Sequence, residues 1–254
     1  REDSMREIVS AISKTEELFI ATMTEYEKGL PVKVAFPATP AFWPVSRILS
    51  EKGLRQLKIA ETEKYAHVTY FFNGGKENSF SGEDRVLVDS PKVKNYDEVP
   101  EMSAGKITDY VLENFAKYDF VLVNFANGDT VGHTGNFKAT VKALEFLDFC
   151  VGRLVSSVLD AGGAAIVTAD HGNAEEKIYS RSGELRTKHN LNPVPFFVVA
   201  NEFKLKTPRS DEEIRKKYEE PKGVLTDVAP TILELLGLSR HPDMTGINLL
   251  KKIS

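Results

Sequence analysis

The sequence has a single cysteine, a single tryptophan and no long apolar run. Cys150 cannot form an internal disulfide, and its apolar neighbours predict a core position, so a reducing compartment is favoured. No stretch approaches the roughly 20 apolar residues that cross a bilayer, and the first residues lack the basic-then-apolar layout of a signal peptide. We therefore predict a cytoplasmic protein with no membrane partner.

The sequence also lacks a strong excess of either charge: 33 Lys and Arg residues face 37 Asp and Glu residues, for a formal net charge of -4. This balance predicts no extended basic face and no nucleic-acid partner. An anionic small molecule would need local arginines or metal ions. The 254 residues suffice for one large α/β domain. Because the chain opens Arg-Glu-Asp without a methionine, we expect a piece of a longer protein.

Short apolar runs rich in β-branched or aromatic residues predict buried strands at residues 18–22, 68–72, 85–88, 120–125, 164–168 and 195–199. Helical patterns cover residues 42–51, 103–115, 137–159 and 225–236, with Ser103 as an expected N-cap. This alternation predicts an α/β fold, a mostly parallel sheet with helices on both faces. Ligands of such sheets collect at the carboxyl ends of the strands.

Two regions break the strand and helix pattern. Residues 33–40 contain two closely spaced prolines and predict a linker, with a domain boundary near Pro37. Residues 1–38 and residues 39–254 would then belong to different domains. Residues 204–222 are strongly charged and hold two prolines, so we expect them to form an exposed excursion.

Aspartate and histidine follow two of the predicted strands. Asp129 and His133 come after the apolar run at 120–123, and Asp170 and His171 come directly after the strand at 164–168. Glycines beside both pairs permit the tight turning that would let each pair converge on one ion.

A third histidine, His189, precedes the predicted strand at 195–199. Three of the five histidines thus lie beside strand ends, whereas His67 and His241 are predicted to be structural or surface residues. Mixed carboxylate and imidazole ligands suit manganese or zinc better than magnesium or calcium. Five such ligands exceed the usual share of one ion, so we predict two divalent ions, an arrangement used for displacement at phosphorus.

These motifs resemble those of the cofactor-independent phosphoglycerate mutases, in the alkaline phosphatase superfamily. The resemblance covers nearly the whole chain from about residue 40. It rests on Asn124-Phe-Ala-Asn-Gly-Asp-Thr-Val-Gly-His, Thr168-Ala-Asp-His-Gly-Asn, Lys58-Ile-Ala-Glu-Thr-Glu-Lys-Tyr-Ala-His, Pro100-Glu-Met-Ser-Ala and Thr226-Asp-Val-Ala-Pro-Thr. It implies an alkaline-phosphatase-like domain at residues 39–254, and the end of an inserted transferase domain at residues 1–38.

The resemblance also implies roles for the site residues. One manganese ion would be held by Asp129, His133 and His189. The second would be held in part by Asp170 and His171.

Substrate contacts follow from the same resemblance. Lys64 would contact the transferred phosphoryl group. Arg1 resembles the first arginine of a substrate-binding Arg-x-Asp-Arg element, but Ser4 stands where the second arginine is expected. A hydroxyl cannot replace the paired contacts of a guanidinium.

The implied reaction interconverts 3-phosphoglycerate and 2-phosphoglycerate through a phosphoserine, without bisphosphoglycerate, in a parent that is expected to be monomeric. The nucleophilic serine and an aspartate of the second metal shell belong to an N-terminal region absent from this sequence. Ser156 and Ser157 lie in a helical pattern away from the motifs, so the chain alone is predicted to be inactive. A related phosphopentomutase or phosphatase, and a catalytically dead metal-binding module, remain alternatives.

Overall fold

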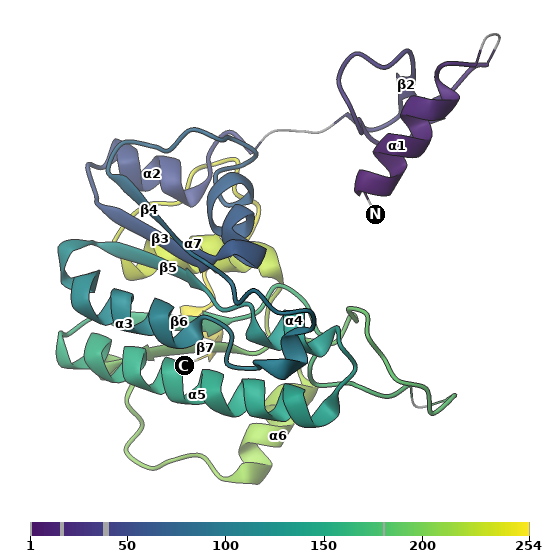
Figure 1. The fold of residues 1–254 in the computed structure, drawn as a ribbon. Helices are drawn as coiled ribbons and strands as arrows, with labels where there is room; N and C mark the ends of the chain where they lie inside the picture. Colours follow the sequence, from purple (N-terminus) through teal and green to yellow (C-terminus); the bar gives the residue numbers. More distant parts are fainter. Residues whose placement is uncertain (1, 16–17, 38–40, 180, 254) are drawn as a thin grey trace. The chain divides into compact units, whose positions relative to one another are not determined.

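Three parallel strands form the centre of the fold in a computed structural model, which describes residues 2–15, 18–37, 41–179 and 181–253 (Figure 1). The order across this sheet is β4 (Glu83–Val88), β3 (Gln56–Glu61) and β5 (Phe120–Asn124). A separate antiparallel pair consists of β6 (Ala164–Thr168) and β7 (Phe196–Ala200). The predicted α/β class and mostly parallel pairing are confirmed.

The chain divides into two compact units, one up to Phe42 and one from Trp43 onward. The first unit holds α1 (Glu2–Ile12) and a two-stranded parallel sheet of β1 (Ala21–Thr22) and β2 (Lys33–Val34). The strand predicted at 18–22 is therefore reduced to its last two residues. The assignment of residues 1–38 and 39–254 to two domains of a longer protein stays a prediction.

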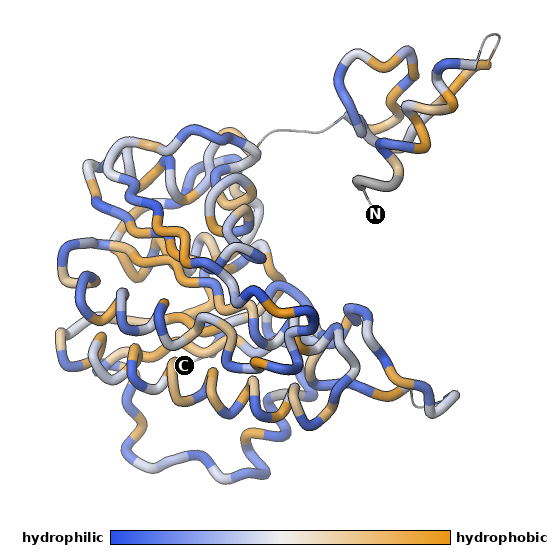
Figure 2. Tube along the Cα trace, viewed as in Figure 1, coloured by the Kyte–Doolittle hydropathy of each residue, from blue (hydrophilic) through white to orange (hydrophobic). Residues whose placement is uncertain are grey.

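Helices cover both faces of the three-stranded sheet (Figure 1). On one face, Ile59 of β3 packs with Ile107 and Val111 of α3 (Ala104–Asn114), and α5 (Phe137–Asp160) lies beside α3. On the other face, Leu49 of α2 (Val45–Glu51) packs with Leu233 of α7 (Val228–Leu235). Figure 2 shows apolar residues concentrated along the central strands. Because apolar side chains are buried on both faces of the sheet, the ends of its strands are held in place.

The strand predicted at 68–72 is wrong: this segment forms a π-helical turn, His67–Phe71, after a 3-10 turn at Thr62–Lys64. The chain must reverse direction after β3, and a helical turn buries Val68 while leaving Phe71 exposed. The local preference of β-branched and aromatic residues for strands yields to this tertiary demand. Ser103 does occupy the N-cap position of α3, but its hydroxyl donates to Asp89 O at 2.7 Å instead of capping the helix.

The remaining helices are short and lie mostly at the edges of the fold. They are α4 (Asn127–Gly132), α6 (Asp211–Glu219), α8 (Leu250–Ile253) and 3-10 turns at Tyr96–Glu98, Phe115–Lys117, Asn201–Phe203 and Leu225–Asp227. The described residues of 204–222 are all exposed, as predicted. Within the described residues, no helix combines the length and apolar character needed to cross a membrane.

A buried ion pair lies inside the sheet on the side of α2. Lys58 and Glu83 have fully buried side chains, and Lys58 Nζ lies 3.2 Å from Glu83 Oε2. The ammonium also donates to Ser46 Oγ at 2.7 Å and to Asn73. Burial lowers the pKa of Lys58 to about 8, although the charge of Glu83 opposes this shift. Burial raises the pKa of Glu83, but hydrogen bonds led by Arg85 and Asn73 hold it below its ordinary value.

Replacing Glu83 by Gln is expected to lower the free energy of unfolding by about 3 kcal/mol, because it leaves the Lys58 ammonium buried without a carboxylate. The neighbouring Asp84 is a matched control, since its pair with Arg55 is half-exposed at 3.3 Å. Asp84→Asn should cost less than about 1 kcal/mol. Urea unfolding of both variants measures the difference, and equal losses would contradict a special role for the buried pair.

The pKa of Lys58 also predicts a pH dependence of stability. Because its folded value of about 8 lies below the ordinary 10.5, the unfolded chain binds more protons between these two values. The Lys58 contribution to the free energy of unfolding therefore rises with pH across this window. Lys58→Met lacks this titrating group. The difference in the free energy of unfolding between the unmodified chain and this variant should therefore widen from pH 7.5 to pH 10 in parallel urea titrations. A difference that narrows as the pH rises would contradict the lowered pKa of Lys58.

Candidate metal centre

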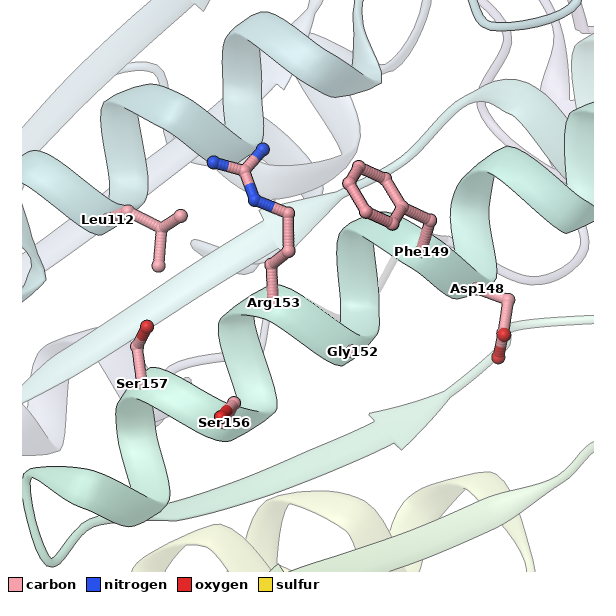
Figure 3. A pocket seen from close by; sticks show the side chains of 7 residues that line it. All are labelled: Leu112, Asp148, Phe149, Gly152, Arg153, Ser156 and Ser157. Carbon is pink, nitrogen blue, oxygen red and sulfur yellow. The ribbon is translucent and has the colours of Figure 1, made fainter.

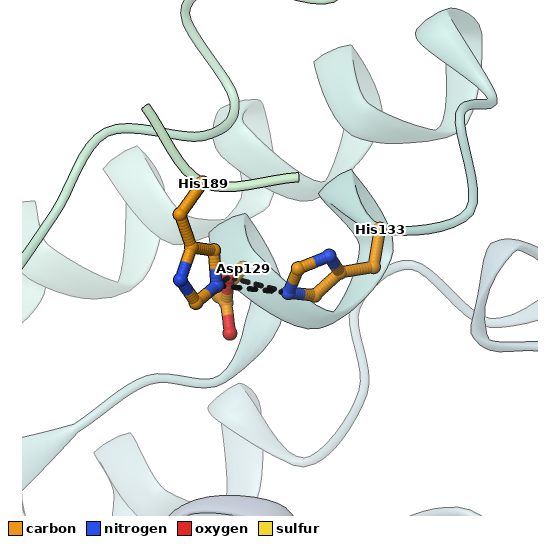
Figure 4. Close-up of side chains that lie close together, drawn as sticks. All are labelled: Asp129, His133 and His189. Carbon is orange, nitrogen blue, oxygen red and sulfur yellow. Dashed lines mark hydrogen bonds and ion pairs between the residues drawn. The ribbon is translucent and has the colours of Figure 1, made fainter. Parts of the chain in front are cut away.

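Asp129 and His133 lie just past the carboxyl end of β5, where the chain enters α4 (Figure 4). Asp129 lies in the first turn of this helix and His133 follows directly after it, so the two side chains share one face at a spacing of four residues. His133 Nε2 is 3.0 Å from Asp129 Oδ1. The turn predicted between Asp129 and His133 is thus a short helix, and this helix brings their side chains together.

His189 joins this pair from the segment that precedes β7. Its Nε2 lies 3.0 Å from Asp129 Oδ1 and 3.0 Å from His133 Nε2 (Figure 4). The three potential ligand atoms all lie within 4.8 Å of one another. The structure therefore brings together the three residues that the sequence predicted to share an ion, although they are up to 60 residues apart in the chain.

The ring of His133 is oriented by a backbone carbonyl. His133 Nδ1 lies 2.6 Å from Thr187 O, and a carbonyl only accepts, so the proton of the neutral ring is on Nδ1. This leaves the Nε2 lone pair directed at Asp129 and His189. Histidines that bind metal ions in proteins are commonly fixed in this way, by a partner on the other ring nitrogen. Two imidazole nitrogens and one carboxylate oxygen fit a manganese or zinc ion.

Lys64 and Asn173 complete the surroundings of the Asp129 carboxylate. Lys64 Nζ donates to Oδ2 at 2.5 Å, and Asn173 Nδ2 donates to Oδ1 at 2.7 Å. Burial raises the pKa of Asp129, but these two hydrogen bonds and the positive charge of Lys64 outweigh it and hold the pKa well below its ordinary value. The carboxylate is therefore charged at neutral pH and available to a cation.

Asp170 and His171 follow β6 and reach the same edge without joining the cluster of three. The side chain of Asp170 is 65% exposed, and its Oδ1 lies 3.4 Å from His171 Nε2. The His171 ring stacks on that of His189, with centroids 3.5 Å apart. His171 Nδ1 is buried and has no hydrogen-bond partner among the described residues. The structure thus brings three of the five predicted ligands together and leaves Asp170 and His171 as a separate pair.

Neither of the two remaining histidines belongs to this cluster of three. Arg1 lies outside the described residues. His241 stacks on Trp43 with ring centroids 4.0 Å apart, a structural role. His67 is exposed but lies near the centre: burial and the charge of Lys64 lower its pKa, and the charges of Asp170 and Asp129 oppose this shift.

Ser156 and Ser157 line a shallow hollow between α3 and α5 (Figure 3). Leu144 of α5 is near Gly128 of α4, and Ser156 lies about 18 Å further along the helix axis. These serines are therefore remote from Asp129.

Two residues with contacts at the site had no predicted role. Asn173 lies in the quoted Asp-His-Gly-Asn motif, and an amide so soon after a strand end was a usable signal. Lys177 gave no such signal, because it lies in a charged run that is typical of solvent-exposed loops. Its side chain is nevertheless buried, and its ammonium donates to Gly132 O at 2.7 Å.

Comparison with known proteins agrees with this geometry. The chain is 50% identical over 236 residues to the 2,3-bisphosphoglycerate-independent phosphoglycerate mutase of a Synechococcus strain, covering 92% of this chain and 44% of that protein. The enzyme of the same name from Clostridium botulinum strain Langeland is 47% identical over 263 residues, covering 99% of this chain and 49% of that protein. The chain thus spans less than half the length of these relatives.

A solved structure is also similar. The phosphoglycerate mutase of Leishmania mexicana, crystallised at low cobalt concentration, superposes with a TM-score of 0.73 at 30% identity. The match covers 89% of this chain and 43% of that protein. The sequence profile of the metalloenzyme superfamily matches residues 40–240, which include every residue of the cluster around Asp129. The chain belongs to the metalloenzyme superfamily.

Proposed function

We propose that this chain supplies the metal-binding part of a phosphoglycerate mutase that works without 2,3-bisphosphoglycerate. The observation that carries the proposal is the convergence of Asp129, His133 and His189, with ligand atoms within 4.8 Å of one another. It is supported by relatives that carry this enzyme name and are about 50% identical over nearly the whole chain.

The proposal assigns a role to each residue of the site. Asp129, His133 and His189 hold one divalent ion, manganese by preference, while Asp170 and His171 supply part of the ligands of a second ion. When bound, the ions lower the pKa of an attacking hydroxyl and neutralise charge on a phosphoryl group. Lys64 lies 2.5 Å from Asp129 and is within reach of a phosphoryl group at this edge. Its ammonium stabilises the negative charge that develops on the phosphoryl oxygens.

The complete reaction needs groups outside this chain. The implied serine nucleophile would form a phosphoserine between 3-phosphoglycerate and 2-phosphoglycerate. Among the described residues, no serine hydrogen-bonds to Asp129, His133 or His189. Ser156 and Ser157 lie in the hollow on α5. Because the chain spans only 44% of the Synechococcus relative, the remaining part of such an enzyme would supply the nucleophile. The chain alone then binds metal but does not turn over substrate.

Calorimetric titration with Mn²⁺ is expected to show one tight site, which His133→Ala weakens by more than about 100-fold. Loss of even an outer-shell partner of a metal ligand costs 10- to 100-fold in affinity, and a ligand itself should cost more. His241→Ala is the matched control, because this histidine stacks on Trp43 and is not a member of the cluster. Equal affinities of the two variants would refute a site at Asp129.

Activity is tested by joining this chain to the part of the Synechococcus relative that it does not cover. The chimera should convert 3-phosphoglycerate to 2-phosphoglycerate, whereas this chain alone should give no detectable product in the same coupled assay. In the chimera, Lys64→Met should lower kcat/KM by about 100-fold or more, because it removes a charge at the phosphoryl group. Lys142→Met, an exposed lysine on α5, should leave the rate unchanged.

The same assay separates the alternative functions. Turnover of a pentose phosphate or a generic phosphoester in preference to 3-phosphoglycerate would assign the chain to a phosphopentomutase or phosphatase. Metal binding without any turnover in the chimera would favour a binding module. Product formed by the isolated chain would overturn the division of labour proposed above.

A further inference from the structure

Lys177 is a buried lysine that hydrogen-bonds to Asn173. Asn173 in turn donates to Asp129 Oδ1, the carboxylate oxygen that Lys64 does not bind. Lys177 is only 5% exposed, and no carboxylate lies within ion-pair distance of its ammonium among the described residues. Its three donors are instead directed at Gly132 O (2.7 Å), Asn173 Oδ1 (2.8 Å) and Asn173 O (3.4 Å). A buried charge without a carboxylate partner lowers the free energy of unfolding, so we expect Lys177 to have a role other than stabilising the fold.

The lysine determines how the Asn173 side chain is oriented. Because an ammonium only donates, the carbonyl oxygen of the Asn173 amide must face Lys177. The NH₂ group then points the other way, and Nδ2 donates to Asp129 Oδ1 at 2.7 Å and to Asp129 O at 3.3 Å. A reversed amide would direct its oxygen at the Asp129 carboxylate, which is repulsive. The lysine therefore selects the orientation that binds Asp129.

A close approach of α4 to Asn173 supports the same contact. A Cβ added to Gly132 would lie 2.9 Å from Asn173 Oδ1 and 3.1 Å from its Cγ, so a side chain here would displace the Asn173 amide. Glycine at this position therefore lets the amide reach Asp129 and lets Lys177 reach the Gly132 carbonyl at once. The three residues pack as one unit behind the carboxylate.

The network also reaches the segment that carries His189. Glu175 Oε2 accepts from the Asn173 backbone N–H at 2.8 Å, and Glu175 Oε1 accepts from Asn190 Nδ2 at 2.6 Å. Asn190 directly follows His189 and pairs with the backbone of Gly172. The loop after β6 thus connects the helix that holds Asp129 to the segment that holds His189.

From these contacts we infer that Lys177 is a positioning residue, which acts through the Asn173 amide to orient the Asp129 carboxylate for a divalent cation. The inference rests on the proposed metal centre. Outer-shell partners of metal ligands commonly contribute 10- to 100-fold to affinity, because they fix the ligand in its binding geometry.

The experiment measures Mn²⁺ affinity by calorimetry, and unfolding by circular dichroism, on the same set of variants. Lys177→Met should bind Mn²⁺ about 10-fold more weakly than the unmodified chain. Lys58→Met is the matched control: it also removes a fully buried lysine and should lose stability, but its network lies inside the sheet and its Mn²⁺ affinity should not change. If the role of Lys177 were purely structural, Lys177→Met would lose stability but would bind Mn²⁺ as tightly as Lys58→Met does.

Two further variants complete the test, and the first of them, Gly132→Ala, keeps it decisive if Lys177→Met fails to fold. Gly132→Ala leaves Lys177 in place but displaces the Asn173 amide, and should also weaken Mn²⁺ binding about 10-fold. If Lys177 acts through Asn173, the double variant Lys177→Met/Asn173→Ala should bind Mn²⁺ no more weakly than Asn173→Ala alone.

The outcomes separate this inference from the proposal beneath it. If the unmodified chain binds Mn²⁺ and both Lys177→Met and Gly132→Ala bind it equally well, the positioning role is overturned and the metal centre stands. If His133→Ala binds as tightly as the unmodified chain, the metal centre itself is misplaced and the inference is overturned with it.

Discussion

The Asp129 carboxylate is the point on which the arrangement of the site depends. Lys64 donates to one oxygen, and Asn173 donates to the other, beside which the ring nitrogens of His133 and His189 lie. These partners come from the turn after β3, the loop after β6, the end of α4 and the segment before β7. A single charge, kept ionised by its partners although it is partly buried, thus gathers four segments at one edge of the fold.

The central strand β3 fixes the position of that edge. Its six residues are all buried, and its charged members find partners on opposite faces: Lys58 with Glu83, and Glu61 with the hydroxyl of Ser90 and the backbone of Ser103. Because these groups are satisfied only in one register, the strand cannot slide without leaving buried charges unpaired.

Much of the fold could be predicted from local pattern. The strands ending near Asn124 and Thr168 were predicted because they are uninterrupted apolar runs. The strand β3 was missed because Gln56, Lys58 and Glu61 interrupt its apolar residues, and only the tertiary structure shows that each has a buried partner. The turn at His67–Phe71 was predicted as a strand for the opposite reason, since its composition favours a strand while its position after β3 requires a reversal.

The sequence by itself determined the ligand types and their attachment to strand ends, because both are encoded within a few neighbouring residues. Only the tertiary structure decided that Asp129, His133 and His189 meet, and that Asp170 stays exposed. It alone placed Lys177, which lies in a charged run of the sequence and had no predicted role, in contact with Asn173. The physical reason is that hydrogen bonds and charge interactions between residues some 40 to 60 positions apart exist only once packing has brought those segments within about 3 Å.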